Sequence, residues 1–575
     1  MRRSLTIMNS SKNVFCRQIA DLLAAHGVKA AYISPGSRNA PLVLALEARG
    51  EIEKHVVVDE RSAAFQALGH SLVDRRPVLL VCTSGTAVLN YAPAVAEAYY
   101  AGVPLIVVSA DRPAEWIDQD DSQTIRQNGI LGAIVKGSYD VRAVPEGAGG
   151  EFTQDHLWTV NRTVNEAMLT AIDGKPGPVH INVQLGEPLG ETVESHDSPQ
   201  RSVSLVKTKE TLDRQVLKSL AMRLASSKVL LVAGSLPPDD RLIKGVRMIA
   251  GMPNVAVMTE TLSNLHEPAP YATMIDSVLC RMTEKEKEAM RPDIVISTGG
   301  ALVSRMLKQY LRVYPPKQHW SVGHSNYFCD CFKCLTDRID MDPAYFFSQL
   351  SGVLTRMSVT EDVADYSEKW LRLREQARNT AEKYIDNCGW SDLKAFDILL
   401  RETEIDNLFV SNGTPVRYSQ LLPHECHAEY CNRGVSGIDG MTSTAVGAAR
   451  AYKGKTLLIS GDTSWLYDSG ASALADIPAR MSMVVIDNSG GGIFRFIKST
   501  SGISPEILER YFCVGDHPDI ASIAMAYGIE TLEAESEDSL RGGIEWLSAE
   551  SECPRLLVVR TPSYESAFVL RKYFL

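Results

Sequence analysis

The sequence contains no apolar run close to the ~20 residues that cross a bilayer as a helix. Its start, MRRSLTIMNSSKN, has twin arginines, but the apolar run after them covers only Leu5 to Met8 and is interrupted by Thr6. Such a run is too short for an export signal. We therefore expect a cytoplasmic protein that does not enter a membrane.

Cysteine is too sparse for a disulfide framework, with 11 residues in a chain of 575. Two segments nevertheless combine cysteine with histidine. The first, HWSVGHSNYFCDCFKC, contains His319, His324, Cys329, Cys331 and Cys334, and the second, HECHAEYC, contains His424, Cys426, His427 and Cys431. Neither shows the paired C-x-x-C spacing of a zinc ribbon, so the pattern favours ordinary strand and loop thiols over structural zinc.

Positive charge is in deficit, with 59 Lys and Arg against 70 Asp and Glu, for a net charge of −11. This balance argues against general binding to nucleic acid or to anionic membranes. A small anionic substrate would therefore need its own local cluster of Arg or Lys.

A chain of 575 residues is too long to fold around one hydrophobic core. At roughly 150 residues per domain, its length predicts three or four domains. Apolar strands alternate with amphipathic helices in three stretches, including HVVVD (55–59) followed by ERSAAFQALGHSLV. This alternation predicts three doubly wound α/β domains with mostly parallel sheets. We place them at residues 1–190, 205–355 and 390–575, with a polar linker after the first and a charged helix before the last.

Two strand ends in the last domain carry polar side chains. LLISGDTSWLYDSG begins at Leu457 and places Asp462 after an apolar run, and VVIDNSGGGIF begins at Val484 and places Asn488 after the next. The intervening segment is long enough for the crossover that parallel neighbours need, so both side chains are expected at the ligand-binding edge of the sheet. With a backbone carbonyl at Gly490, they suit Mg²⁺.

Gly490, Gly491 and Gly492 would let the backbone approach phosphate groups closely. Taken singly, Gly-Asp and Asn-Ser-Gly-Gly are common turns, and a nucleotide site would explain them equally well. As a pair they resemble the signature of thiamine diphosphate enzymes, Gly-Asp-Gly followed after about 25 residues by Asn, with Thr463 in place of the third glycine. This resemblance implies bound thiamine diphosphate and Mg²⁺, for which Mn²⁺ can substitute.

Such enzymes also need a glutamate that hydrogen-bonds the pyrimidine ring of the cofactor. Glu60, in DERSAAFQALG after a predicted strand of the first domain, is the candidate. The alternative interpretation is that Glu60 only compensates the dipole at a helix N-terminus.

Six further segments identify a narrower resemblance. They are SPGSRNAPL (34–42), DERSAAFQALG (59–69), TSGTAVLNY (83–91), ADRPAEW (110–116), NRGVSGIDG (432–440) and NSGGGIF (488–494). Together they resemble the 2-succinyl-5-enolpyruvyl-6-hydroxy-3-cyclohexene-1-carboxylate (SEPHCHC) synthases of menaquinone biosynthesis. The resemblance implies decarboxylation of 2-oxoglutarate and conjugate addition of the succinyl unit to isochorismate. It also implies a homodimer, or a tetramer of two dimers, with active sites shared between subunits.

The resemblance implies a role for each matching residue. Catalysis would involve Glu60, Ser37, Arg38, Arg417 and Arg433. Substrates would contact Arg38, Arg112, Gln123, Arg305, Arg417, Arg433, Ile493 and Phe494. The cofactor would contact Glu60, Ile438, Asp462, Thr463, Ser464, Asn488, Gly490, Gly491, Gly492, Ile493 and Phe494, with the metal on Asp462, Asn488 and Gly490. The planar guanidinium fork suits the several carboxylates of the two substrates.

The sequence departs from the family pattern at two places. Ser122 precedes Gln123 where an Asn is usual, and Met306 follows Arg305 where a second basic residue is common. The substrate contacts expected at these two positions therefore rest on weaker matches.

Three alternatives remain at this level. A pyruvate-using acetolactate synthase or decarboxylase would not need several arginines, and NRGVSGIDG argues against it. An NAD- or FAD-dependent oxidoreductase is disfavoured because VLLVAGSLPPDD lacks the G-x-G-x-x-G fingerprint. A non-catalytic homologue is disfavoured because Glu60, Asp462 and Asn488 are all present.

Overall fold

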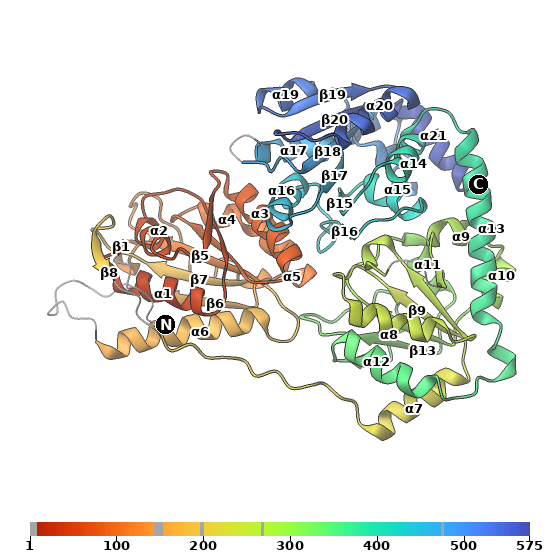
Figure 1. Ribbon diagram of the computed structural model, residues 1–575, viewed down its shortest axis with the longest axis horizontal. Coiled ribbons are helices and arrows are strands. Elements are labelled where there is room, and N and C mark those ends of the chain that lie inside the picture. The colour runs from red at the N-terminus through yellow and green to blue at the C-terminus, as the bar shows by residue number, and fades with distance from the viewer. Residues whose placement is uncertain (1–7, 143–152, 196–199, 266–269, 473–475) are drawn as a thin grey trace. The chain divides into compact units, whose positions relative to one another are not determined.

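The fold is described from a computed structural model that covers residues 8–142, 153–195, 200–265, 270–472 and 476–575. Three six-stranded sheets are flanked by helices (Figure 1), and all neighbouring strands within these three sheets are parallel. The prediction of doubly wound α/β domains with mostly parallel sheets is thereby confirmed. Among the described residues, no helix has both the length and the apolar character of a membrane span.

The chain forms two compact units, which are described separately. The first contains residues 1–207, 434–453 and 467–478, and the second contains residues 208–433, 454–466 and 479–575. The three sheets fall one each within the predicted ranges 1–190, 205–355 and 390–575, although two short segments of the last range pack with the first unit. The domain boundaries themselves stay a prediction.

The sheet of the first unit has the strand order β3-β2-β4-β5-β7-β6. Its strands are β2 (Ala30–Ile33), β3 (Glu53–Val56), β4 (Val78–Cys82), β5 (Leu105–Asp111), β6 (Gly137–Val141) and β7 (Val179–Gln184). A separate antiparallel pair joins β1 (Met8–Ser11) to β8 (Thr192–Ser195). The helices are α1 (Val14–Ala25), α2 (Ala40–Glu47), α3 (Glu60–Asp74), α4 (Ala87–Asn90), α5 (Ala92–Ala101), α6 (Gln154–Ile172) and α16 (Met441–Ala451).

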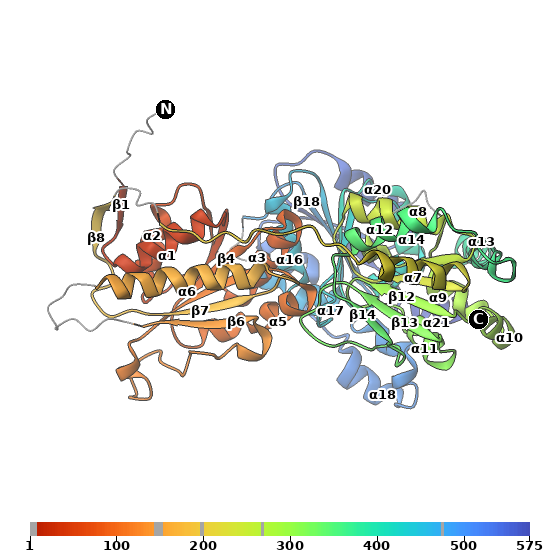
Figure 2. The same ribbon diagram turned by 90° about the horizontal axis from the view of Figure 1, so that it is seen from below.

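Alternation along the strands gives this sheet a hydrophobic core on each face. Leu79 and Val81 of β4 point into one core with α1, α2 and α6, whereas Leu80 and Cys82 point into the other with α3 and α5. Figure 2 shows α6 lying alongside α1, which it contacts. The apolar strands of the sequence therefore reflect a sheet covered on both sides.

The predicted strand over HVVVD was too long at its C-terminal end. The structure ends β3 at Val56, and the side chains of Val56 and Val58 are 63% and 52% exposed. The physical reason is that β3 is the edge strand and pairs with β2 alone. Asp59 then caps α3, because its carboxylate accepts the backbone N–H of Ser62 at 3.2 Å.

The second unit holds two sheets, with strand orders β11-β10-β9-β12-β13-β14 and β16-β15-β17-β18-β20-β19. The first comprises β9 (Val229–Ala233), β10 (Val255–Thr259), β11 (Tyr271–Ala272), β12 (Ile294–Thr298), β13 (Gln318–Val322) and β14 (Asp337–Ile339). The other comprises β15 (Asn407–Val410), β16 (Ala428–Tyr430), β17 (Thr456–Gly461), β18 (Met481–Asp487), β19 (Glu530–Ala534) and β20 (Arg555–Arg560).

Helices cover these two sheets, and one long helix joins them. The helices with the central sheet are α7 (Arg214–Ala225), α8 (Asp240–Ala250), α9 (Ile275–Arg281), α10 (Glu284–Ala289), α11 (Arg305–Val313) and α12 (Pro343–Leu354). Those with the last are α14 (Asp392–Glu402), α15 (Pro415–Leu421), α17 (Asp462–Tyr467), α18 (Pro505–Leu508), α19 (Ile520–Ala526), α20 (Glu537–Ser548) and α21 (Ser563–Tyr573). Helix α13 (Tyr366–Asn387) buries Trp370 in the central core and Ile385 in the C-terminal core.

Helices α3 and α16 of the first unit pack backbone against backbone. A Cβ added at Gly69 of α3 would lie 1.8 Å from the carbonyl oxygen of Thr444, and one at Gly447 of α16 would lie 1.8 Å from that of Gln66. Both glycines are therefore required by the close approach of the two helices.

We expect Gly447→Ala to destabilise the protein by about 3 kcal/mol, because the added methyl must push α16 away from α3. Differential scanning calorimetry would show this as a lower melting temperature. The matched control is Gly352→Ala in α12, where an added Cβ meets nothing within 4 Å and the position is exposed. That control should be neutral or stabilising by up to ~1 kcal/mol. Equal melting temperatures for the two variants would contradict the backbone contact.

Candidate active site

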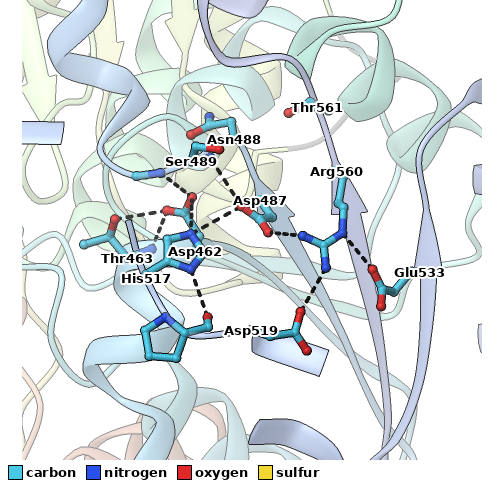
Figure 3. A network of polar contacts seen from close by, with 12 residues as sticks. Asp462, Thr463, Asp487, Asn488, Ser489, His517, Asp519, Glu533, Arg560 and Thr561 are labelled. Atoms are coloured by element: carbon cyan, nitrogen blue, oxygen red, sulfur yellow. Dashed lines mark hydrogen bonds and ion pairs between the residues drawn. The ribbon is translucent and has the colours of Figure 1, made fainter. Parts of the chain in front are cut away.

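The polar residues predicted at two strand ends lie at one edge of the C-terminal sheet. Strands β17 and β18 are parallel neighbours, with Gly461 paired to Ile486. Asp462 begins α17 directly after β17, and Asn488 follows the last residue of β18. Figure 3 shows the resulting polar network.

Asp462 ties the two strand ends together. Its side chain is 2% exposed, and its Oδ2 accepts the backbone N–H of Gly490 at 2.7 Å. Its Oδ1 accepts the hydroxyl of Thr463 at 3.0 Å and also the backbone N–H of Thr463. Ser464, the next residue, is buried. The structure thus brings Asp462, Thr463 and Gly490 of the predicted set into direct contact.

The amide of Asn488 is oriented by a carboxylate that the sequence analysis missed. Asn488 Nδ2 donates to Asp392 Oδ2 at 2.7 Å, and the other oxygen of Asp392 accepts the Thr561 hydroxyl at 2.6 Å. Burial raises the pKa of Asp392, and these hydrogen bonds oppose that rise by stabilising the ionised form. Because a carboxylate only accepts, the NH₂ of Asn488 must face it, which leaves the amide oxygen to serve as a metal ligand.

The glycines after Asn488 are required by close packing. Gly490 has φ of 101°, and a Cβ there would lie 2.2 Å from the carbonyl oxygen of Cys513. The N–H of Gly491 donates to that same oxygen at 2.7 Å, and the N–H of Gly492 donates to the Gly490 carbonyl at 2.7 Å. The three glycines therefore form one tight turn over the strand end.

Asp487 and His517 extend this network and were also missed. The Nε2 of His517 lies 3.6 Å from Asp462 Oδ2 and 3.4 Å from Asp487 Oδ1, and ligand atoms of the three residues converge closely enough to hold a metal ion. The contact with Asp462 raises the pKa of His517 to about 9, although partial burial acts in the opposite direction. Arg560 binds the other oxygen of Asp487 at 3.1 Å (Figure 3).

The donor atoms at this edge fit a hard divalent cation and phosphate groups. Carboxylate and amide oxygens are the ligands that Mg²⁺ prefers, and two buried carboxylates, Asp462 and Asp487, supply the charge. Asp487 could have been found from the sequence, because it is the last residue of the same apolar strand as the predicted Asn488. His517 lies in a loop, where no strand-end rule applies.

In the first unit, Glu60 stands at the first position of α3, beyond the end of β3. Its side chain is half-buried, and burial raises the pKa of its carboxyl. Glu60 therefore lies after a strand and at a helix start, as predicted. Its role toward a pyrimidine ring stays a prediction.

Arg38 and Arg112 are close enough to influence each other. Arg38 is buried, donates to the Leu185 carbonyl at 3.0 Å, and has its pKa lowered first by burial and then by the charge of Arg112. Arg112 donates to the Ser122 carbonyl at 2.8 Å, directly before the exposed Gln123. Ser37 directly precedes Arg38 and is exposed as well. The four predicted residues Ser37, Arg38, Arg112 and Gln123 therefore belong to one region of the first unit.

A second arginine cluster lies in the other unit, which also contains the Asp462 site. Burial first, and then the charges of Arg433 and Arg305, lower the pKa of Arg417 to about 10. Arg433 Nη1 donates to Asn412 Oδ1 at 2.8 Å, and Arg417 donates to the Gly413 carbonyl. The three arginines predicted for substrate carboxylates are thus brought together.

A buried carboxylate accompanies this cluster. Glu260 accepts the backbone N–H groups of Val303 and Ser304 at 2.8 and 2.7 Å, directly before Arg305. Burial raises the pKa of Glu260 to about 7 against the opposing effect of these hydrogen bonds. Glu260 therefore anchors the start of α11, on which Arg305 stands, although no sequence pattern indicated it.

The predicted apolar residues lie in different units. Ile493 and Phe494 are half-buried in the second unit, where the Phe494 ring meets that of Phe512 edge-on at 5.8 Å. Ile438 belongs to the first unit and its side chain is 41% exposed. The catalytic and binding roles of all these residues stay predictions.

The two His- and Cys-containing segments differ in their geometry. In the first, His319 pairs with the hydroxyl of Ser297 at 2.7 Å, and His324 lies between Glu210 and Asp340. In the second, ligand atoms of His424 and Cys426 lie within 4.8 Å of each other and of a carboxylate oxygen of Glu429. This second arrangement has no paired C-x-x-C spacing, so the cysteine pattern in the sequence did not indicate it.

Comparison with known proteins agrees with this geometry. The N-terminal TPP binding domain of thiamine pyrophosphate enzymes matches residues 15–130, which include Glu60. A SEPHCHC synthase of Porphyromonas gingivalis is 40% identical, with 97% of this chain and 96% of that protein covered. The synthase of Flavobacterium johnsoniae is 34% identical, with 98% of this chain and 99% of that protein covered. The synthase of Flavobacterium psychrophilum is 35% identical, with 97% of this chain and 98% of that protein covered. The chain belongs to the SEPHCHC synthase family.

Membership of the SEPHCHC synthase family confirms the resemblance drawn from the six sequence segments. The matching N-terminal domain supports thiamine diphosphate as the cofactor, and the chain is an enzyme of the thiamine diphosphate-dependent class. The rival assignment to an NAD- or FAD-dependent oxidoreductase is thereby set aside.

We expect Asp392→Ala to weaken binding of thiamine diphosphate with Mg²⁺ by about 10–100-fold, because Asn488 loses the partner that fixes its amide. Isothermal titration calorimetry in the absence of substrate measures this directly. The control is Asp538→Ala, which removes a fully exposed carboxylate on α20. An affinity equal to that of the control would show that Asp392 does not position a ligand.

Proposed function

We propose that this protein catalyses the formation of SEPHCHC from 2-oxoglutarate and isochorismate, with loss of CO₂, in menaquinone biosynthesis. The observation that carries the proposal is the cluster of Arg305, Arg417 and Arg433 in the same unit as Asp462 and Asn488. A chain with net charge −11 that concentrates three guanidinium groups in one place, with Arg417 and Arg433 half-buried, is suited to a substrate with several carboxylates.

Asp462, Asn488 and the carbonyl of Gly490 would hold Mg²⁺, for which Mn²⁺ can substitute, and through it the diphosphate of the cofactor. When bound, thiamine diphosphate supplies an electron sink for the decarboxylated substrate. Asp392 would keep the amide oxygen of Asn488 available to the metal, and His517 lies beside Asp462 and Asp487. With the divalent cation bound, this edge of the sheet would favour a multiply charged anion.

The remaining residues would bind and orient the substrates. Glu60, whose pKa is raised by burial, would hold a proton toward the pyrimidine ring. Arg417 and Arg433 would bind carboxylates of the 2-oxoglutarate-derived unit, and Arg38 and Arg112 would bind those of isochorismate. Ile438, Ile493 and Phe494 would supply apolar contacts and exclude water.

Mass spectrometry of the reaction products tests the proposed function. With thiamine diphosphate and Mg²⁺, we expect a product whose mass is the sum of 2-oxoglutarate and isochorismate less CO₂. Asp462→Ala should bind the cofactor weakly and form no product. Carboligation with pyruvate in place of 2-oxoglutarate, and none with 2-oxoglutarate, would instead establish the acetolactate synthase-like alternative.

We also propose that the active unit is a homodimer, alone or paired into a tetramer, in which each site combines Glu60 of one chain with Asp462 of the other, as the family resemblance implies. The competing arrangement would place Glu60 and Asp462 of each site in a single chain.

Mixing two inactive variants separates these arrangements. After reversible dissociation of Glu60→Gln and Asp462→Ala, a shared site should restore about a quarter of the wild-type sites, because half of the dimers are mixed and half of their sites carry neither lesion. Product formation measures the recovery, and differently sized fusion tags confirm subunit exchange. Confirmed exchange with no recovered activity would place Glu60 and Asp462 of each site in one chain.

A further inference from the structure

A convergent set of ligand atoms lies in the loop after α15 and in β16, outside the proposed cofactor site. The side chains of His424 and Glu429 are 2% and 0% exposed, and His424 Nε2 lies 2.9 Å from Glu429 Oε2. The Sγ of Cys426 completes a group of three potential ligand atoms that all lie within 4.8 Å of one another. No part of the proposed reaction uses these three residues.

The hydrogen bonds around this group leave one ligand atom of each residue directed inward. His424 Nδ1 lies 2.9 Å from the Leu422 carbonyl, which only accepts, so Nδ1 carries a hydrogen. Glu429 Oε1 accepts the Ser419 hydroxyl at 2.7 Å. Metal-binding histidines commonly donate their second ring N–H to a backbone carbonyl, which fixes the orientation of the ring. His424 Nε2 and Glu429 Oε2 are therefore pre-oriented as ligands, and Cys426 Sγ lies within 4.8 Å of both atoms.

Charge balance also favours a cation at this point. The carboxylate of Glu429 is fully buried, and its Oε2 lies 2.9 Å from His424 Nε2. A positive charge placed between these atoms is therefore stabilised by the buried carboxylate. A divalent ion bound to one carboxylate, one thiolate and one neutral imidazole would make the buried group electrically neutral, which removes the cost of an unpaired buried charge.

We propose that His424, Cys426 and Glu429 bind one Zn²⁺, with a water molecule as the fourth ligand. A nitrogen, sulfur and oxygen set with a thiolate selects zinc over magnesium, and three protein ligands are compatible with tetrahedral coordination. The ion joins the loop after α15, which carries Arg417, to β16, which leads to Arg433. Zinc would thus fix the two chain segments that present these arginines. This inference is independent of the proposed function.

Metal analysis of the untagged, full-length protein tests this inference without substrate or cofactor. After addition of Zn²⁺ and dialysis, we expect about one zinc per wild-type chain by atomic emission, and less than about a tenth of that in Cys426→Ser. The cobalt-substituted protein should show a thiolate-to-metal charge-transfer band in the near ultraviolet, together with the strong visible bands of tetrahedral Co²⁺.

Matched variants separate this site from other sources of metal. His427→Asn, in the same loop, and Cys553→Ser, at an exposed thiol, should keep the zinc and the charge-transfer band. Asp462→Ala should keep them as well, because the Asp462, Asp487 and His517 group contains no sulfur. Folding of each variant is checked by circular dichroism, and zinc should raise the melting temperature of wild type but not of Cys426→Ser.

Two results would overturn the proposal. One is a folded wild-type protein that retains no zinc and gives no thiolate band with cobalt. The other is a Cys426→Ser protein that keeps both its zinc and its thermal stabilisation. Either result would leave His424 and Glu429 as a buried ion pair without a metal, and neither would bear on the products formed from 2-oxoglutarate and isochorismate.

Discussion

The parallel pairing of β17 with β18 is the constraint on which the candidate site depends. Because the register aligns Gly461 with Ile486, the residues that follow the two strands leave the sheet at the same edge. The hydrogen bond from the Gly490 N–H to Asp462 then closes the gap between the two strand ends. Every other contact of the network, from Asp392 to Arg560, orients a side chain around this junction.

The charged side chains of the second unit differ in the partners that surround them. Within the described residues, Asp392 is buried with hydrogen-bond donors, whereas Asp487 meets Arg560 and His517. Arg417 instead lies among other arginines, and its lowered pKa records both the loss of hydration and their repulsion. Repulsion of this kind is relieved when an anion binds, which supports the proposal that the cluster binds a carboxylate.

The sequence predicted features that depend on local pattern. Alternating apolar strands and helices were enough for the three parallel sheets, and the positions of Asp462 and Asn488 after apolar runs were enough to place them at one edge. The edge position of β3 was not predictable, because strand order depends on long-range pairing. The apolar residues Val57 and Val58, which follow β3, therefore made the strand look longer than it is.

The residues that were missed depend on contacts between distant parts of the chain. Asp392 lies 96 positions before Asn488, in a helix whose sequence gives no sign of a partner at a strand end. Glu260 lies 43 and 44 positions before its hydrogen-bond partners Val303 and Ser304, and farther still before Arg433. Glu429 was missed because histidine and cysteine spacing does not include carboxylate ligands. It nevertheless belongs to the same short segment as His424 and Cys426.

The contact between α3 and α16 has a mechanical consequence. At Gly69 and Gly447 no side chain separates the two backbones, so there is no rotamer that could absorb a small movement of one helix against the other. Farther along, Gly440 fits directly against the ring of Phe65 and extends the rigid contact toward the turn that holds Ile438. We therefore expect the start of α3, with Glu60, and this turn to move together.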